Sequence, residues 1–146
     1  DENQKNLEAT IRRAVELEPT HGMYLNNLGL LYVMRQDGPQ AREALEASLE
    51  VFEGRAPRFV YNNLGLAHER CGGLESAHRA FEDALFVDPG YVRAQVNLSR
   101  VRDALEARAV AARDPGQDLE PSQEAPTARH APSEPTAPAS SLGAEL

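Results

Sequence analysis

The sequence predicts an all-α protein in which antiparallel helix pairs follow one another along the chain. The composition favours helix, because Ala, Leu, Glu and Arg are common among the 146 residues while β-branched residues are sparse. A short motif also recurs, as LNNLGL at 25–30 and YNNLGL at 61–66, with an offset of 36. Proline and glycine interrupt the chain at intervals that suit short helices.

Six helices are expected, over residues 3–18, 23–36, 40–53, 57–71, 74–87 and 92–112. Pro19 and Pro89 end the helices before them, because the residue preceding a proline is pushed out of helical geometry. Gly-Pro at 38–39 and Gly-Gly at 72–73 make the turns within the two pairs. No such break follows the start of the sixth helix until Pro115, so this helix is expected to be the longest.

Small and large residues recur at fixed distances after both motifs. The first copy continues through Leu28, Gly29, Tyr32, Ala41 and Leu45, and the second through Leu64, Gly65, His68, Ala77, Phe81, Ala84 and Pro89. These spacings resemble the 34-residue pattern of the tetratricopeptide repeat (TPR) family from about residue 3 to residue 112. The resemblance implies a right-handed superhelical α-solenoid, in which each helix pair buries the apolar face of its neighbour.

The resemblance also divides the chain. Residues 1–113 are expected to form the TPR-like solenoid, with a partial repeat at 3–20, full repeats at 22–55 and 58–91, and a capping helix at 92–112. Residues 114–146 hold six of the ten prolines and six acidic residues against one arginine. Such a segment buries too little apolar surface to offset its ordering entropy, so a disordered Pro/Ala/Glu/Ser-rich tail is predicted.

Composition and motifs exclude several function classes. A formal net charge of −8 argues against nucleic-acid binding, and no apolar run approaches the 18 residues of a membrane span. No P-loop, GxSxG or HExxH motif is present, so no enzyme activity and no cofactor are expected. His68, Cys71 and His78 offer only three metal ligands at a spacing that matches no standard site, so no metal is expected. The predicted compartment is the cytoplasm, with the periplasm as the alternative.

A concave surface is the candidate site that the resemblance implies, because the first helix of each pair lines the inner face of such a solenoid. Asn27, Asn63 and Asn97 occupy one equivalent position in three of these helices, and an amide both donates and accepts hydrogen bonds. The predicted peptide-binding groove comprises Met23, Asn26, Asn27, Leu30, Met34, Phe59, Asn62, Asn63, Leu66, Arg70, Arg93, Asn97 and Arg100.

The leading hypothesis is a protein–protein interaction module or scaffold that binds a peptide or helix of a partner in this groove. Two of five positions, Asn63 and Arg93, fit the carboxylate clamp that grips chaperone C-termini, so that ligand is not the lead. Arg93 and Arg100 remain cations for an acidic ligand group.

Three alternatives stay open. The asparagines recur in the general repeat pattern, so stacking between repeats also explains them. A second alternative is a structural C-terminal cap of a longer array, which the start in mid-repeat favours. A third is the adaptor portion of a larger enzyme. Self-association through an apolar stripe of Leu7, Ile11 and Val15 on the N-terminal helix is a further expectation.

Overall fold

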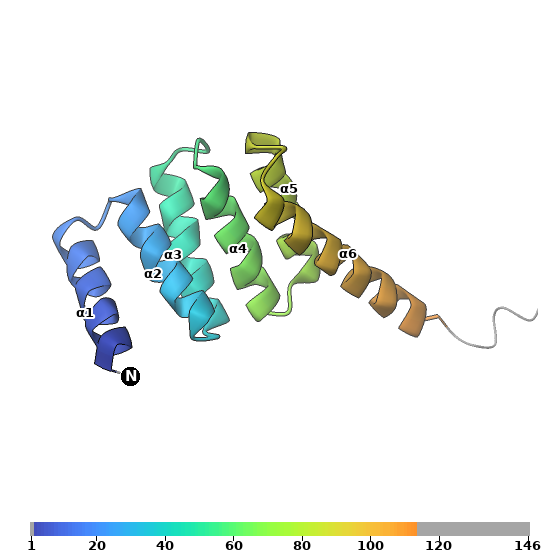
Figure 1. The fold of residues 1–146 in the computed structure, drawn as a ribbon, viewed down its shortest axis with the longest axis horizontal. Helices are drawn as coiled ribbons and strands as arrows, with labels where there is room; N and C mark the ends of the chain where they lie inside the picture. The colour runs from blue at the N-terminus through green and yellow to red at the C-terminus, as the bar shows by residue number, and fades with distance from the viewer. Residues whose placement is uncertain (1, 114–146) are drawn as a thin grey trace, which may run out of the picture. The chain divides into compact units, whose positions relative to one another are not determined.

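The computed structural model describes residues 2–113, and this part of the chain is all-helical (Figure 1). The helices are α1 (Glu2–Leu17), α2 (Gly22–Met34), α3 (Gly38–Val51), α4 (Arg58–Arg70), α5 (Leu74–Val87) and α6 (Val92–Ala111). The prediction of an all-α fold with six helices is confirmed for these residues. Residue contacts divide the chain into two units, 1–113 and 114–146. The expected disordered tail at 114–146 lies outside the described residues.

The helix ends follow local chemistry. The Asp37 side chain caps α3 by accepting a hydrogen bond from the backbone N–H of Gln40 at 3.3 Å, and Pro39 lies in the first turn. The third helix therefore begins two residues earlier than expected. It also ends two residues earlier, because Glu53 and Gly54 adopt positive φ angles of 50° and 75° that no helix accommodates.

Each helix packs against the next one along the chain, and α2 also contacts α4. Figure 1 shows this succession from α1 in blue to α6 in orange. A buried hydrogen bond joins the first pair, because the Ser48 hydroxyl on α3 donates to the Gly22 carbonyl at the start of α2 at 2.7 Å. Because α2 contacts α4, the first helices of these two pairs are neighbours. This arrangement brings residues of the two first helices together.

Two apolar clusters hold the helices together. The larger one joins α2, α3, α4 and α5 through Tyr32, Val33, Ala41, Ala44, Leu45, Leu64, Ala67 and Ala80. The smaller one joins α5 to α6 through Ala77, Phe81, Leu98 and Val101. Leu45 and Phe81 are fully buried and lie against Gly29 and Gly65, respectively. The two glycines therefore allow the helices of each pair to approach closely.

The first helix is attached differently. None of the residues of α1 is buried. The helix contacts α2, and some of these contacts are polar. Glu8 forms ion pairs with Arg12 at 2.8 Å and with Arg35, which follows α2. The Arg12 guanidinium also lies 5.7 Å from the centroid of the Tyr32 ring. No helix in the described part has the length and hydrophobicity needed to cross a bilayer.

Candidate functional site

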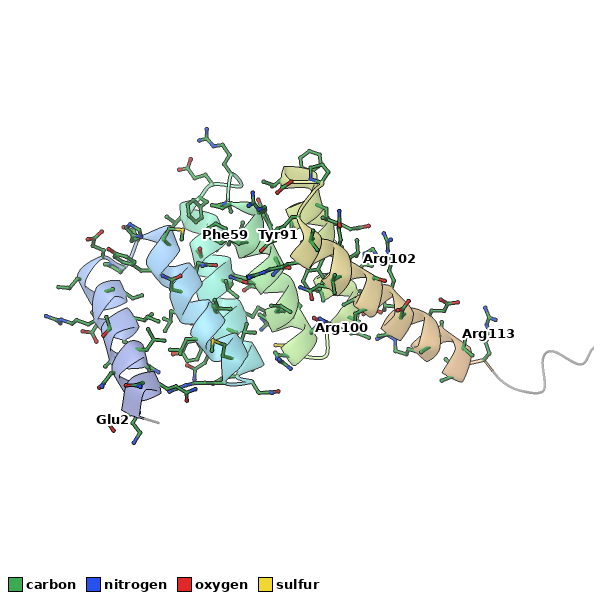
Figure 2. All side chains as sticks on the ribbon, in the orientation of Figure 1. Glu2, Phe59, Tyr91, Arg100, Arg102 and Arg113 are labelled. Atoms are coloured by element: carbon green, nitrogen blue, oxygen red, sulfur yellow. The ribbon has the colours of Figure 1, made fainter. Side chains whose placement is uncertain are left out.

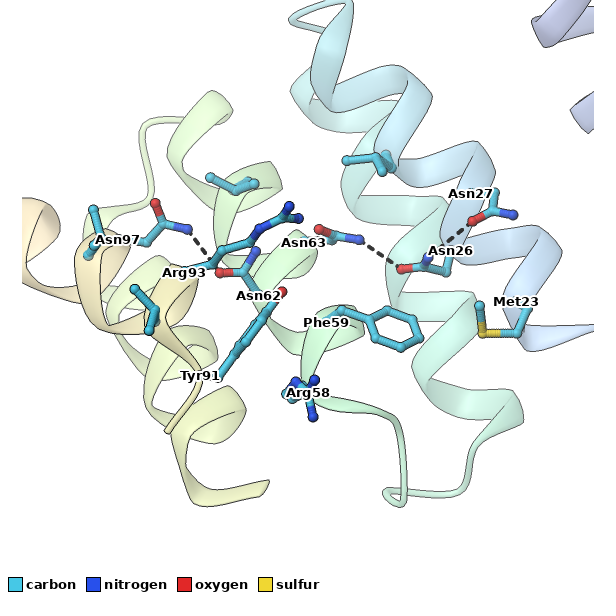
Figure 3. Close-up of a pocket in the computed structure, with 14 residues that line it drawn as sticks. Met23, Asn26, Asn27, Arg58, Phe59, Asn62, Asn63, Tyr91, Arg93 and Asn97 are labelled. Atoms are coloured by element: carbon cyan, nitrogen blue, oxygen red, sulfur yellow. Dashed lines mark hydrogen bonds between the residues drawn. The ribbon is translucent and has the colours of Figure 1, made fainter. Parts of the chain in front are cut away.

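A hollow of about 720 Å³ opens where α2, α4 and α6 lie beside one another (Figure 3). Its walls come from α2 as far as Leu30, from α4 as far as Leu66, from α6 as far as Asn97, and from Tyr91, which precedes α6. The lining residues are Met23, Asn26, Asn27, Leu30, Arg58, Phe59, Asn62, Asn63, Leu66, Tyr91, Val92, Arg93, Val96 and Asn97. We call this hollow the groove.

Ten of the thirteen residues in the predicted site line the groove: Met23, Asn26, Asn27, Leu30, Phe59, Asn62, Asn63, Leu66, Arg93 and Asn97. Met34 does not, and its side chain is 65% exposed at the end of α2. Arg70 and Arg100 line a second hollow of about 400 Å³, which shares only Leu66 with the groove. These three residues therefore lie outside the groove, because they stand further toward the C-terminal ends of their helices than the lining residues do. Their part in ligand binding stays a prediction.

Four groove residues are absent from the predicted site, namely Arg58, Tyr91, Val92 and Val96. Arg58 lies in the first turn of α4, with its guanidinium 5.1 Å from the centroid of the Tyr91 ring and 3.1 Å from the Asp88 carboxylate. Figure 2 shows Tyr91 near the start of α6. Each of the four missed residues stands within two positions of a predicted groove residue, and this nearness in sequence was the only signal that could have identified them.

The paired asparagines bond from one helix to the next. The Asn63 side chain donates through Nδ2 to Oδ1 of Asn26 at 3.0 Å, and this contact is buried. The Asn97 side chain donates in the same way to Oδ1 of Asn62 at 2.9 Å. Figure 3 shows both bonds crossing between helices. Because these donors are occupied, part of the recurrence of asparagine is explained by stacking of the first helices.

Several amide atoms in the groove keep their hydrogen-bonding capacity. Within residues 2–113, Oδ1 of Asn63 and Oδ1 of Asn97 accept no hydrogen bond. The Oδ1 atom of Asn27 accepts a long bond from Asn26 at 3.4 Å, while its Nδ2 donates to none of the described residues. Asn27 is exposed and Asn97 is half-buried, whereas Asn63 is only 8% exposed. Asn27 and Asn97 are therefore better placed than Asn63 to meet a ligand.

The apolar groups of the groove surround these amides. Met23, Leu30, Phe59 and Leu66 are half-buried, and Val96 is 59% exposed. Apolar side chains that stay accessible in a concave surface are typical of an interaction site, because a partner that covers them removes apolar area from water.

No model of a known protein family matches the chain, and no curated protein matches it either. The geometry and chemistry of the groove are therefore the basis for assigning a function.

Few side chains that enzymes use as nucleophiles, general acids or bases, or metal ligands line the groove. Its fourteen lining residues include no His, Cys, Ser, Asp or Glu. In the described part of the chain, no three His, Cys, Asp or Glu side chains gather closely enough to hold a metal ion. His78 instead contacts Glu82 at 3.3 Å and accepts a bond from Arg102. Burial lowers the pKa of His68, which favours its neutral form.

The apolar stripe proposed for self-association is only partly open. Leu7 is 50% exposed, whereas Ile11 and Val15 are half-buried on the same helix. The stripe on α1 is therefore narrower than the sequence predicts, because α2 covers part of it.

Proposed function

We propose that residues 2–113 form a TPR-like α-solenoid that binds an extended peptide of another protein in the groove. The binding is non-covalent, and the protein acts as an interaction module rather than as an enzyme. The observation that carries the proposal is the combination of accessible apolar side chains with amide atoms that have no partner within the described residues.

An extended peptide fits this combination better than a helix does. The backbone N–H groups of a helix are bonded internally, whereas those of an extended peptide are free to donate to side-chain oxygens. Oδ1 of Asn97 is an acceptor of that kind, and Nδ2 of Asn27 is a donor for a peptide carbonyl. Met23 and Phe59 would then pack against apolar side chains of the peptide.

In the test, a library of random dodecapeptides displayed on phage is selected for binding to the 146-residue protein. Peptides that are enriched are synthesised, and their Kd values are measured with the unmodified protein and with two variants. Phe59→Ala removes an aromatic side chain from the groove, and we expect it to cost about 2 kcal/mol, or roughly 30-fold in Kd.

Phe86→Ala is the matched control, because Phe86 is 90% exposed on α5 and outside the groove. This control should bind each peptide as the unmodified protein does. Equal affinity of the Phe59→Ala and unmodified proteins for every peptide would contradict the proposal.

A purely structural stack is the second candidate, and the Asn63–Asn26 and Asn97–Asn62 bonds favour it. These bonds account for the recurrence of asparagine without any ligand. Under this alternative the library yields no peptide whose binding depends on Phe59.

A further inference from the structure

Two guanidinium groups stand in the wall of the groove, and no carboxylate does. Arg58 is engaged by Asp88 at 3.1 Å and by the ring of Tyr91. Arg93, in the first turn of α6, is exposed and has neither an ion pair nor a side-chain hydrogen bond with residues 2–113. Figure 3 shows its side chain reaching from α6 toward Asn63. The groove therefore contains one guanidinium that the described structure leaves uncompensated.

The arginines of the neighbouring hollow differ from Arg93. The Arg100 guanidinium donates to both carboxylate oxygens of Glu69, at 2.6 Å and 3.3 Å. Arg70 donates to the amide oxygen of Gln36 at 3.3 Å. Arg100 is therefore already paired with Glu69, whereas Arg93 has no such partner among residues 2–113.

The uncompensated charge in the groove limits how acidic a ligand can be. Residues 1–113 carry a formal net charge of −3, and Arg93 is the one guanidinium in the groove wall without an ion pair to residues 2–113, so a second carboxylate would find no partner there. A single carboxylate beside Arg93 gains a charge-assisted hydrogen bond at close range and adds little long-range repulsion. One free guanidinium also matches one carboxylate. A C-terminal Asp or Glu would present two, one from its side chain and one from the chain end.

On the basis of the proposed function, we infer that the peptide carries one internal Asp or Glu whose side-chain carboxylate pairs with Arg93. The residue next to it is positioned by Asn97, which lies one turn further along the same face of α6. A large apolar side chain of the peptide packs against Phe59 on α4. The ligand class is thus an extended, mainly apolar segment with a single carboxylate.

The test uses the enriched dodecapeptides, synthesised with an acetylated N-terminus and an amidated C-terminus so that no terminal carboxylate remains. Each Asp or Glu is replaced in turn by Asn or Gln. We expect one replacement to weaken binding by about 10-fold, and Arg93→Gln in the protein to weaken binding of the parent peptide by a similar factor. Combined, the two changes should weaken binding no more than either one alone.

Arg113→Gln is the matched control, because Arg113 is exposed and lies outside the groove. This variant should keep the affinity of the unmodified protein. Raising the salt concentration from 50 to 500 mM should weaken binding to the unmodified protein and to Arg113→Gln more than binding to Arg93→Gln.

Three results would overturn the inference. They are full affinity of blocked peptides in which every acidic residue is replaced, an unchanged Kd of Arg93→Gln, and binding that requires a free C-terminus. If Phe59→Ala still weakens binding in these cases, the peptide-binding function stands and only the acidic specificity fails. If Phe59→Ala has no effect either, both proposals fail.

Discussion

Single residues set how closely the paired helices approach. A Cβ atom at Gly65 would lie 2.4 Å from Cε1 of Phe81, and one at Gly29 would lie 2.4 Å from Cγ of Leu45. Both neighbours are fully buried, so neither side chain can swing out into solvent. The repeat register alone identified these glycines. In both repeats a glycine is followed at the same distance by a large apolar residue, and this recurrence indicates that the two residues pack against each other.

Gly65→Ala should therefore destabilise the fold by about 1–3 kcal/mol, because Phe81 has to leave its present position. Chemical denaturation followed by circular dichroism measures the change. Ser99→Ala is the control, since Ser99 occupies the equivalent position of α6 and is exposed. Its unfolding free energy should stay within about 0.5 kcal/mol of that of the unmodified protein. Equal stability of the Gly65→Ala and unmodified proteins would refute this account of the packing.

The groove residues show what sequence does and does not reveal at this scale. The repeat register located Asn27, Phe59 and Asn97. It did not show that Nδ2 of Asn97 donates a hydrogen bond to Asn62, because equivalent repeat positions indicate only that two residues are near each other. Tyr91 was missed for another reason: it precedes its helix, where the period of the helix gives no information.

Among the described helices, α1 alone has no buried residue, and charged contacts help to attach it. The proline and glycine breaks were enough to predict its limits within a residue or two. They could not predict how it is attached, because that depends on Glu8 meeting Arg35 of the next helix pair. Hydrogen bonds from Arg35 and Arg12 hold the pKa of Glu8 below its ordinary value of 4.5.

This lowered pKa predicts a pH dependence. A carboxylate whose pKa is depressed by folding stabilises the native state above its ordinary pKa, and this contribution is lost as pH falls below about 4.5 through the folded value. At pH 7, Glu8→Gln should lower the melting temperature and the hydrogen-exchange protection of α1. At pH 3 the Glu8→Gln and unmodified proteins should differ less in both melting temperature and exchange protection.

Glu2→Gln is the control for α1, because Glu2 lies on the same helix and is exposed. Because Glu2 lies in the first turn, where an acid favours the helix dipole, its replacement should lower both quantities only slightly, and by less than Glu8→Gln does at pH 7. A Glu8→Gln effect of the same size at pH 7 and pH 3 would show that the ion pairs do not attach α1.

At the scale of the molecule, the groove exists because first helices of successive pairs are neighbours. Residues from positions about 35 apart, such as Asn62 and Asn97, thereby meet in one wall. The repeat offset predicted this meeting, and the all-helical fold is the part of the sequence prediction that the structure confirms. The sequence could not predict which arginine is free to bind a ligand. Only the structure shows that Arg100 pairs with Glu69, whereas Arg93 lines the groove without an ion pair to the described residues.

The most direct test of the central claim is a ¹H–¹⁵N NMR titration of the full-length chain with a blocked peptide from the library. The account predicts that the largest shift changes cluster on three helices, at the side-chain amides of Asn27 and Asn97 and at the backbone amides of Phe59 and Arg93. The side-chain amides of Asn3 and Asn6 on α1 should stay unchanged. Changes confined to α1, or to a single helix away from the groove, would contradict the claim that α2, α4 and α6 together form a peptide site.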